Sequence, residues 1–301
     1  MLAFLPAPLR GAIAALLLMA NTIFWCTPLF ALAVVRLALP QRARPALDSL
    51  LNAVATAWVA GNSGWMRLTQ AMQWDTQGIA RLDAKGWYIV LCNHQSWADI
   101  FVLQHVFNRR IPMLKFFLKR ELIFVPVIGL AWWALDFPFM RRHSDEVLRK
   151  DPHKRLDDIE ATRRACARFA RVPTSVMNFV EGTRFTRRKH AAQRSPFRHL
   201  LRPKAGGLAM ALGALGRQFD SVVDVTIVYP DGVPGFWAFL CGRAPRVIVR
   251  AERLPIPTEL AAVDPAADPM QRKRVQHWLA GRWQRKDALI GALLPGGHAA
   301  A

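Results

Sequence analysis

The residues of this chain best suited to chemistry are a histidine and an aspartate that follow a short apolar run. The run Trp87–Cys92 is rich in β-branched and aromatic residues, which predicts a buried strand. His94 lies just beyond this run, and Asp99 comes five residues later, at the start of an apolar-periodic segment that predicts a helix. We therefore expect His94 on a strand-to-helix turn, which is where α/β proteins place reactive side chains.

The spacing of the pair restricts how the two side chains can meet. On a regular helix, residues five apart point about 140° away from each other. His94 and Asp99 meet only if His94 precedes the helix and folds back over its first turn, with Ser96 as the N-cap. Asp99 would then accept the Nδ1 proton and leave Nε2 free as a base. The alternative is a loop histidine beside an aspartate favoured by the helix dipole, and an isolated pair of this kind more often has that explanation.

A second polar motif follows a second strand-like run. Residues 174–180 are mostly apolar, and Glu181-Gly182-Thr183-Arg184 comes directly after them. Two predicted strands that each end in polar, reactive side chains are hard to explain by packing alone. The pattern favours a site built at one edge of a sheet.

Taken in order, these motifs resemble those of the glycerolipid acyltransferases of the lysophosphatidate-acyltransferase type. The signature of that family is Asn-His-x4-Asp, a basic and apolar block, Phe-Pro-Glu-Gly-Thr-Arg, and then a hydrophobic strand with a proline. The resemblance covers about residues 85–235. It implies an α/β fold in which one mixed-sheet acyltransferase domain is flanked by helices and preceded by an N-terminal membrane-embedded helix pair.

The resemblance assigns roles in substrate binding. Arg184 would grip the phosphate of the acceptor head group, because its planar guanidinium matches phosphate geometry. Gly182 would permit close approach of the backbone, and Thr183 would add a hydroxyl. Glu181 would orient Arg184 or contact an acceptor hydroxyl.

Other matches extend this set. Lys119 and Arg142 are further phosphate-binding candidates, and Lys204 belongs to a Pro-Lys-x-Gly-Gly segment whose glycines start a helix near the site. Three positions depart from the family pattern. Val180 replaces the proline before Glu181, Asp136 stands where the family has glycine, and Thr226 replaces the proline of the later hydrophobic strand.

The chemistry that fits is acyl transfer from a thioester to a hydroxyl. His94 would remove the hydroxyl proton while Asp99 orients the imidazole and stabilises its cation. A thiolate is a good leaving group, so no covalent enzyme intermediate is required. Cys92 and Ser96 are the neighbouring nucleophiles, but the strand and the capping role argue against them. No cofactor is implied beyond acyl-CoA or acyl-carrier protein as co-substrate, and no metal, because the pair lacks a third ligand.

Composition points to an anionic and apolar partner. The chain has 301 residues and a net charge of +20, which suits nucleic acid or an acidic membrane surface. Hydrophobic residues make up 52% and there are 11 Trp, which favours the lipid bilayer over nucleic acid. The cysteines, Cys26, Cys92, Cys166 and Cys241, form no C-x-x-C pair and suit a reducing compartment.

The N-terminal segment is the predicted membrane anchor. Residues 11–35 are almost wholly apolar, which is enough for a bilayer of about 30 Å at about 1.5 Å per residue. Pro28 also allows a kinked span or a hairpin within one leaflet, whereas the run is too long for a signal-peptide core. Arg36, Arg42 and Arg44 outweigh Arg10, which predicts a bacterial inner membrane protein whose catalytic domain faces the cytoplasm.

We divide the chain into membrane-anchoring helices at 1–75, an acyltransferase domain at 76–255, and a basic amphipathic helix with its tail at 256–301. The helix at 47–72 is either a core helix or an interfacial one, and the helix at 270–294 either covers the sheet or touches the membrane. We also expect an edge strand and turn at 78–86, a basic loop around 187–194 and a last strand at 246–251.

The predicted function is therefore transfer of a fatty acyl chain to 1-acylglycerol-3-phosphate or a related anionic lysophospholipid. Tyr229-Pro230, and Phe-Thr after Arg184, resemble the lysocardiolipin and lysophosphatidylinositol acyltransferase branch. The alternative from another class is a basic membrane-surface or nucleic-acid-binding protein without this activity, although no nucleic-acid motif supports it. A serine hydrolase is disfavoured because G-x-S-x-G is absent.

Overall fold

A six-stranded mixed sheet forms the centre of the fold. The computed structural model describes residues 1–40, 42, 44–140, 172–261 and 269–295. The strand order is β1-β8-β7-β2-β6-β3. The strands are β1 (Gln73–Gln77), β2 (Tyr88–Cys92), β3 (Leu114–Phe116), β6 (Ser175–Phe179), β7 (Ser221–Val228) and β8 (Arg246–Leu254). Strands β2, β3, β6 and β7 run parallel, whereas β8 is antiparallel to β7 and parallel to β1, which confirms the predicted mixed sheet.

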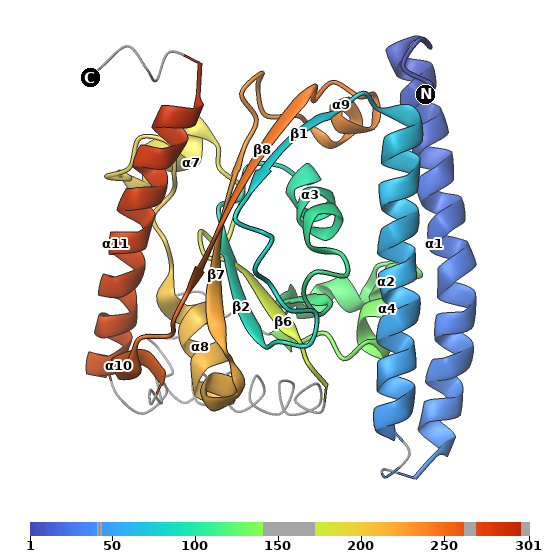
Figure 1. Cartoon of the computed structure of the whole chain (residues 1–301), viewed down its shortest axis with the longest axis horizontal. Helices are drawn as coiled ribbons and strands as arrows, with labels where there is room; N and C mark the ends of the chain where they lie inside the picture. The colour runs from blue at the N-terminus through green and yellow to red at the C-terminus, as the bar shows by residue number, and fades with distance from the viewer. Residues whose placement is uncertain (41, 43, 141–171, 262–268, 296–301) are drawn as a thin grey trace.

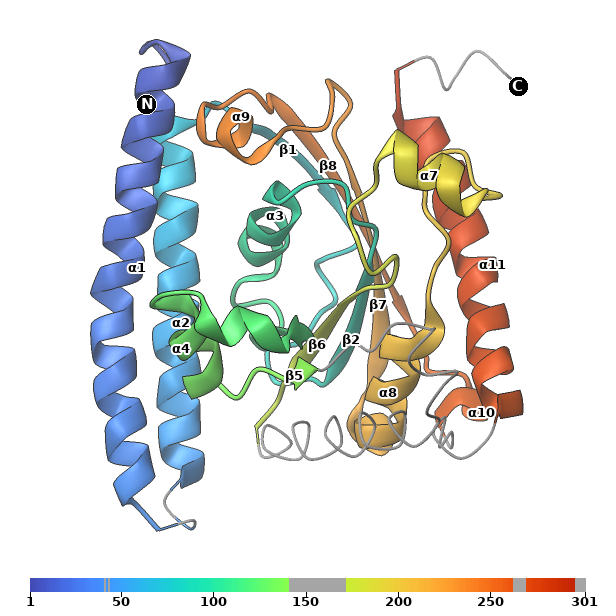
Figure 2. The ribbon, with the colours of Figure 1, turned by 180° about the vertical axis from the view of Figure 1, so that it is seen from behind.

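Helices cover both faces of this sheet (Figures 1 and 2). On one side lie α3 (Ala98–Phe107) and α9 (Phe236–Leu240), and on the other α8 (Ala205–Leu215) and α11 (Pro269–Leu293). Successive residues of β2 alternate between the two cores: Val90 packs with the α3 side and Leu91 with the α8 side. A strand buried on both faces needs the continuous apolar run that the sequence shows.

The C-terminal helix α11 belongs to the core of the domain. Leu279 and Trp283 are fully buried against residues of α8. On the same helix, Lys286 and Arg282 form ion pairs with Asp224 of β7, at 2.6 and 3.0 Å. Of the two alternatives for this helix, the structure shows the sheet-covering one.

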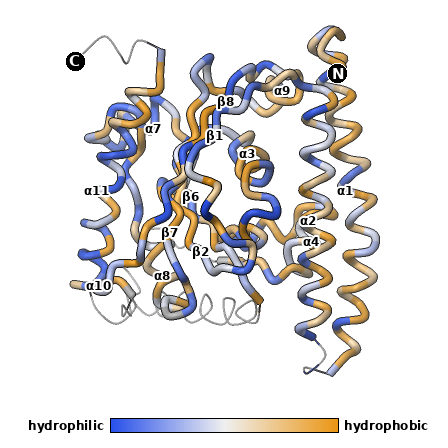
Figure 3. Tube along the Cα trace, in the orientation of Figure 1, coloured by the Kyte–Doolittle hydropathy of each residue, from blue (hydrophilic) through white to orange (hydrophobic). Residues whose placement is uncertain are grey.

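Helices α1 (Ala7–Ala38) and α2 (Arg44–Thr69) form a long antiparallel pair beside the domain (Figure 1). The amide of Asn21 donates to the Trp58 carbonyl and to the side chain of Asn62, both at 2.9 Å. Gly61 makes this approach possible, because a Cβ there would lie 2.0 Å from Asn21 Oδ1. By length and composition, α1 is apolar enough to cross a membrane, and Figure 3 shows it hydrophobic along most of its length.

A small second sheet lies between α1 and the main sheet edge. It pairs β4 (Leu118–Lys119) with β5 (Phe139–Met140), next to the 3-10 helix η2 (Arg120–Phe124) and helix α4 (Ile128–Ala134). Asp136, which stands where the family has glycine, adopts a left-handed φ of 55°. Aspartate tolerates this conformation better than most side chains. Its carboxylate also pairs with Arg36 of α1, so the turn forms without glycine.

Two local predictions were wrong, and a third element, the predicted last strand, is present but longer than expected. Residues 78–86 form a loop rather than a strand, because Gly78 has a φ of 82° and ends the edge strand β1 that precedes it. The expected basic loop contains helix α7 (Arg187–Gln193), which Thr186 caps by accepting the Lys189 N–H at 3.2 Å. Strand β8 extends beyond the expected end to Leu254. The short elements η3 (Gly216–Gln218) and α10 (Thr258–Ala261) complete the described structure.

Candidate active site

The sheet register brings the two predicted motifs to the same edge. Cys92, the last residue of β2, is directly opposite Phe179, the last residue of β6. His94 and Glu181 each follow two residues later, so they leave neighbouring parallel strands at equivalent positions. The N–H of Phe185 also donates to the carbonyl of His94 at 2.7 Å, which joins the two turns.

Asn93 fixes the point at which the chain leaves β2. Its side chain is fully buried and forms two hydrogen bonds of 2.9 Å with the backbone of Ile227: Oδ1 accepts the Ile227 N–H, and Nδ2 donates to the Ile227 carbonyl. The amide thus pairs with β7 much as another strand residue would. His94 is therefore presented by a fixed turn rather than by a loose loop.

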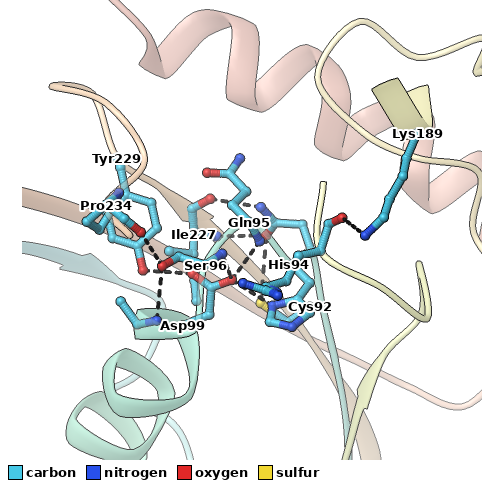
Figure 4. A network of polar contacts seen from close by, with 12 residues as sticks. Cys92, His94, Gln95, Ser96, Asp99, Lys189, Ile227, Tyr229 and Pro234 are labelled. Atoms are coloured by element: carbon cyan, nitrogen blue, oxygen red, sulfur yellow. Dashed lines mark hydrogen bonds and ion pairs between the residues drawn. The ribbon is translucent and has the colours of Figure 1, made fainter. Parts of the chain in front are cut away.

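The His94 and Asp99 side chains meet as the spacing predicted. His94 Nδ1 lies 2.9 Å from Asp99 Oδ2, while His94 precedes α3 and Asp99 lies in its first turn. The same oxygen accepts the backbone N–H groups of Gln95 at 2.6 Å and Ser96 at 2.8 Å. Since Asp99 can only accept, the Nδ1 proton stays on His94 and Nε2 carries the free lone pair. Figure 4 shows this network.

Two further residues complete the surroundings of the pair, and sequence reasoning gave neither a role. The Tyr229 hydroxyl donates to Asp99 Oδ1 at 2.7 Å, and its ring is buried. The Phe179 ring stacks on the His94 imidazole, with 3.9 Å between centroids and 15° between planes. The one feature of the sequence that could have indicated a role for Tyr229 and Phe179 is that both lie at the end of a predicted strand, as His94 and Glu181 do.

Neither neighbouring nucleophile is available for covalent catalysis. Burial raises the pKa of the Cys92 thiol well above its ordinary value, so the thiol stays protonated at neutral pH. The Ser96 hydroxyl donates to the carbonyl of Pro234 at 2.5 Å and accepts the N–H of Ala98 at 3.1 Å. Ser96 was predicted as the N-cap, but that position belongs to Trp97, because the helix begins one residue later than expected.

The second motif forms a tight turn whose arginine faces outward. Gly182 has a φ of 70°, which other residues adopt only with strain, and the N–H of Gly182 donates to the Phe179 carbonyl. The Arg184 guanidinium is exposed and lies 4.8 Å from the centre of the Trp97 ring. The Thr183 hydroxyl accepts a 2.6 Å hydrogen bond from Lys189 of α7, another residue without an assigned role.

Glu181 is fully buried beneath this turn. Burial raises the pKa of its carboxyl well above the ordinary value, and the charge of Lys286 offsets only part of this effect. The backbone N–H groups of Leu201 and His94 lie close by, yet neither makes a hydrogen bond of good geometry to the carboxyl. Within the described residues the carboxyl forms no bond with Arg184, so nothing here supports the orienting role.

The other predicted binding residues are placed differently. The Lys204 side chain passes over Gly182: its Cδ is 3.6 Å from the position that a Cβ on Gly182 would take. The backbone N–H of Lys204 donates to the Val180 carbonyl. Lys119 is exposed on the small second sheet, and no described contact joins it to His94 or Asp99. Arg142 lies outside the described residues. Within those residues, no group of three or more His, Cys, Asp or Glu side chains could hold a metal.

An apolar cavity of about 620 Å³ extends from His94 toward the helix pair. Its walls come from α1, α2, α3, α4, α9, η2 and the ends of β3 and β6, and they are almost entirely aliphatic and aromatic. Trp97, Phe101 and Phe179 line it near His94, and Leu29 and Ala131 line it on α1 and α4. Trp132 also lines it, whereas its neighbour Trp133 is 42% exposed, so the two tryptophans face different surroundings.

Comparison with known proteins identifies the family. Residues 73–230 match the family model described as Acyltransferase, which covers more than half of the chain. The chain therefore belongs to the acyltransferase family. The match includes the strand-end motifs of β2 and β6 and ends directly after Tyr229.

Several named relatives are similar at the level of sequence. The human 1-acyl-sn-glycerol-3-phosphate acyltransferase gamma is 25% identical over 239 residues, which is 75% of this chain and 58% of the human protein. The 1-acyl-sn-glycerol-3-phosphate acyltransferase 3 of Arabidopsis thaliana is 31% identical over 160 residues, or 48% of this chain and 39% of the plant protein. The chain thus spans little more than half the length of the human relative.

One solved structure shares the fold over nearly the whole chain. It is the 1-acyl-sn-glycerophosphate acyltransferase of Thermotoga maritima, with a TM-score of 0.50 and 18% identity. The match covers 91% of this chain and 97% of that chain. The match therefore extends well beyond residues 73–230 and confirms the predicted arrangement of a helix-flanked mixed sheet.

Proposed function

We propose that this protein transfers a fatty acyl chain from a thioester to the free hydroxyl of an anionic lysophospholipid, such as 1-acylglycerol-3-phosphate. The observation that carries the proposal is the free Nε2 of a paired histidine on the wall of an apolar cavity. A base supported by a carboxylate and a compartment for a hydrocarbon chain are the two requirements of this reaction. The names of the relatives support the same acceptor class.

His94 acts as the general base. Its Nε2 takes the proton of the acceptor hydroxyl as the oxygen attacks the thioester carbonyl carbon, and Asp99 stabilises the imidazolium that results. The tetrahedral intermediate then expels the thiolate, which takes up the proton from the His94 imidazolium, so that His94 returns to its neutral form. The product is the diacyl lipid, and the carrier is released as the free thiol of CoA or of acyl-carrier protein.

The cavity holds the acyl chain of the donor. Each buried methylene contributes about 0.8 kcal/mol, so a long chain gains considerable binding energy in a pocket with these aromatic and aliphatic walls. Arg184 lies on the exposed side of the site and holds the acceptor phosphate there. This division places the reacting carbonyl between hydrocarbon on one side and charge on the other.

The protein lies in one leaflet with α1 parallel to the bilayer surface. Helix α1 has 32 residues and is about 48 Å long, and the domain contacts it near both of its ends. Near its start, Gly11 contacts Trp237 of α9, and at its end Arg36 donates to the Ala134 carbonyl of α4. A perpendicular span would carry the polar domain into hydrocarbon, which is unfavourable.

Exposed apolar side chains on α1, α4, α9 and η2 support this orientation. Phe24 is 65% exposed, Trp133 42%, Trp237 54% and Phe124 82%. With the acyl donor supplied from the cytoplasm, the leaflet is the cytoplasmic one of a bacterial inner membrane. Replacing Phe124 and Trp133 with Ser should release the protein from liposomes in a flotation assay; unchanged flotation would contradict this orientation.

The test of the function compares purified wild type with His94→Ala and Asp99→Asn. Each is given a panel of lysophospholipids with long-chain acyl-CoA or acyl-carrier protein, and products are read by lipid mass spectrometry. We expect a diacyl product from wild type, almost none from His94→Ala, and a loss of about 10³-fold or more in Asp99→Asn. Full activity of a folded His94→Ala protein would refute the mechanism, and no product from any pair would favour a binding protein.

A further inference from the structure

The segment from 182 to 204 carries positive charge far beyond what one phosphate needs. It contains eight Lys and Arg residues and no Asp or Glu. Two of these residues contact the turn at 182–184: Lys189 donates a hydrogen bond to the Thr183 hydroxyl, and the Lys204 side chain lies over Gly182. Four others are exposed arginines: Arg187, Arg188, Arg194 and Arg198.

These four guanidinium groups form no hydrogen bond or ion pair with the part of the chain that the structure describes. Asp287 of α11 lies close by, but its carboxylate accepts the backbone N–H groups of Arg198 and His199, at 2.8 and 2.7 Å. Unpaired charges of one sign gathered on one surface repel each other. Their shared arrangement favours an acidic partner.

The arrangement also distinguishes between partners. Helix α7 has no buried residue, and its first two residues, Arg187 and Arg188, point about 100° apart. Two arginines in that relation cannot grip the same phosphate as a fork does. Charges spread over a convex helix and its flanking loop match an extended acidic protein surface better than one small polyphosphate.

The position of the four arginines argues against the membrane. Helix α7 lies beside α11, at the opposite end of the molecule from the α1–α2 pair (Figures 1 and 2). A bilayer that contacts α1, α4 and α9 therefore leaves α7 on the aqueous side. At the same time Lys189 ties α7 to the Thr183 turn, so this surface adjoins the site.

We propose that Arg187, Arg188, Arg194 and Arg198 form the docking surface for the acidic face of an acyl-carrier protein, which delivers the acyl thioester to His94. This inference rests on the proposed function and names its donor. The acyl chain would enter the cavity from the aqueous side, while the lysophospholipid comes from the membrane. Transfer returns the carrier with its phosphopantetheine thiol free.

The test uses the full-length protein with Arg187→Glu and Arg188→Glu combined. Arg81→Glu, an exposed charge reversal in the 78–86 loop, is the matched control. We measure the Kd for a carrier protein loaded with a non-hydrolysable acyl group by fluorescence anisotropy, and kcat/KM with acyl-carrier protein and with acyl-CoA. We expect the double variant to lose about tenfold or more in both carrier-protein measurements, with a loss that shrinks as salt is added.

Activity with acyl-CoA should stay within about twofold of wild type, and Arg81→Glu should behave as wild type in every assay. If kcat/KM with acyl-CoA falls as much as kcat/KM with acyl-carrier protein, the surface binds donor phosphates. If the double variant no longer binds liposomes, the surface contacts the membrane. Either outcome overturns the inference. So would unchanged carrier binding in the double variant. Tight, arginine-dependent carrier binding with no turnover from either donor would refute the proposed function but not the docking surface.

Discussion

The hydroxyl of Tyr229 lies 2.7 Å from Asp99 Oδ1, on the carboxylate that holds His94 through its other oxygen. Tyr229 follows the end of β7, whereas His94 follows β2, and these two strands are neighbours in the sheet. Burial and the charge of Asp99 raise the pKa of Tyr229 well above its ordinary value, so the hydroxyl remains a donor at physiological pH. Tyr229 is thus a positioning residue for the pair.

Replacing Tyr229 with Phe should lower kcat about tenfold and leave the KM for the acceptor unchanged. A hydrogen bond to a charged group contributes about 1.5–3 kcal/mol, and this one acts on the group that orients the base. The measurement is steady-state kinetics with lysophospholipid as the varied substrate.

The chain provides its own control, because it contains only one other tyrosine. Tyr88 is equally buried, and its hydroxyl accepts the backbone N–H of Asp83 at 2.8 Å. Tyr88 is the first residue of β2, whereas the site lies at the other end of that strand. Tyr88→Phe should cost similar stability without lowering kcat. Equal kinetic effects in the two variants would reduce Tyr229 to a structural role.

Replacing Arg184 with Ala should raise the acceptor KM about tenfold or more, with a smaller effect on kcat. Arg184 is exposed, so apart from its contact with the Trp97 ring the Ala variant would lose only the proposed contact with the phosphate. Arg184→Lys should restore part of the affinity, because it keeps the charge but not the planar fork. With monoacylglycerol, which has no phosphate, the Ala variant should equal wild type, and a similar loss there would contradict phosphate binding.

Replacing Glu181 with Gln should stabilise the protein at neutral pH. The folded state raises the pKa of this carboxyl above its unfolded value, so in the window above about pH 4.5 the unfolded state binds fewer protons than the native state. Wild-type stability therefore falls there as pH rises, by up to about 1.4 kcal/mol per pH unit. The amide has no proton to lose and escapes this cost.

Thermal melts of both proteins from pH 4 to pH 8 measure this effect. The Tm advantage of Glu181→Gln should be small near pH 4 and should grow as pH rises toward the pKa of the folded carboxyl. A pH-independent difference between the two proteins would mean that Glu181 titrates alike in the folded and unfolded states.

Replacing Ala131 with Leu should shift donor preference toward shorter acyl chains. Ala131 is buried on α4 and lines the apolar cavity, so a larger side chain takes volume from the acyl chain. Ala134 on the same helix is as buried but does not line this cavity, so Ala134→Leu is the matched control for overpacking, which costs about 1–3 kcal/mol. Competition between long-chain and medium-chain donors gives the ratio, which only the Ala131 variant should change.

The residues that could do chemistry, and the strands that present them, were identifiable from the amino-acid sequence. A continuous apolar run marks β2 because a strand buried on both faces has no polar side. The five-residue spacing of His94 and Asp99 allows contact only across the start of a helix, which the structure confirms at 2.9 Å. The position of α1 was also evident, because residues 11–35 are almost wholly apolar, although the helix extends beyond them at both ends, from Ala7 to Ala38.

Which distant residues join the site, and which do not, depends on how the chain packs in three dimensions. Tyr229 reaches Asp99, and Phe179 reaches His94, through strand register, which depends on pairing between segments far apart in the chain. Lys119 shows the opposite case, because it is exposed on the small second sheet and no described contact joins it to His94. Five helices, a 3-10 helix and the ends of β3 and β6 together line the cavity, and no local pattern in the sequence encodes that space. Propensity and spacing act over a few residues, whereas a binding site depends on packing across the whole fold.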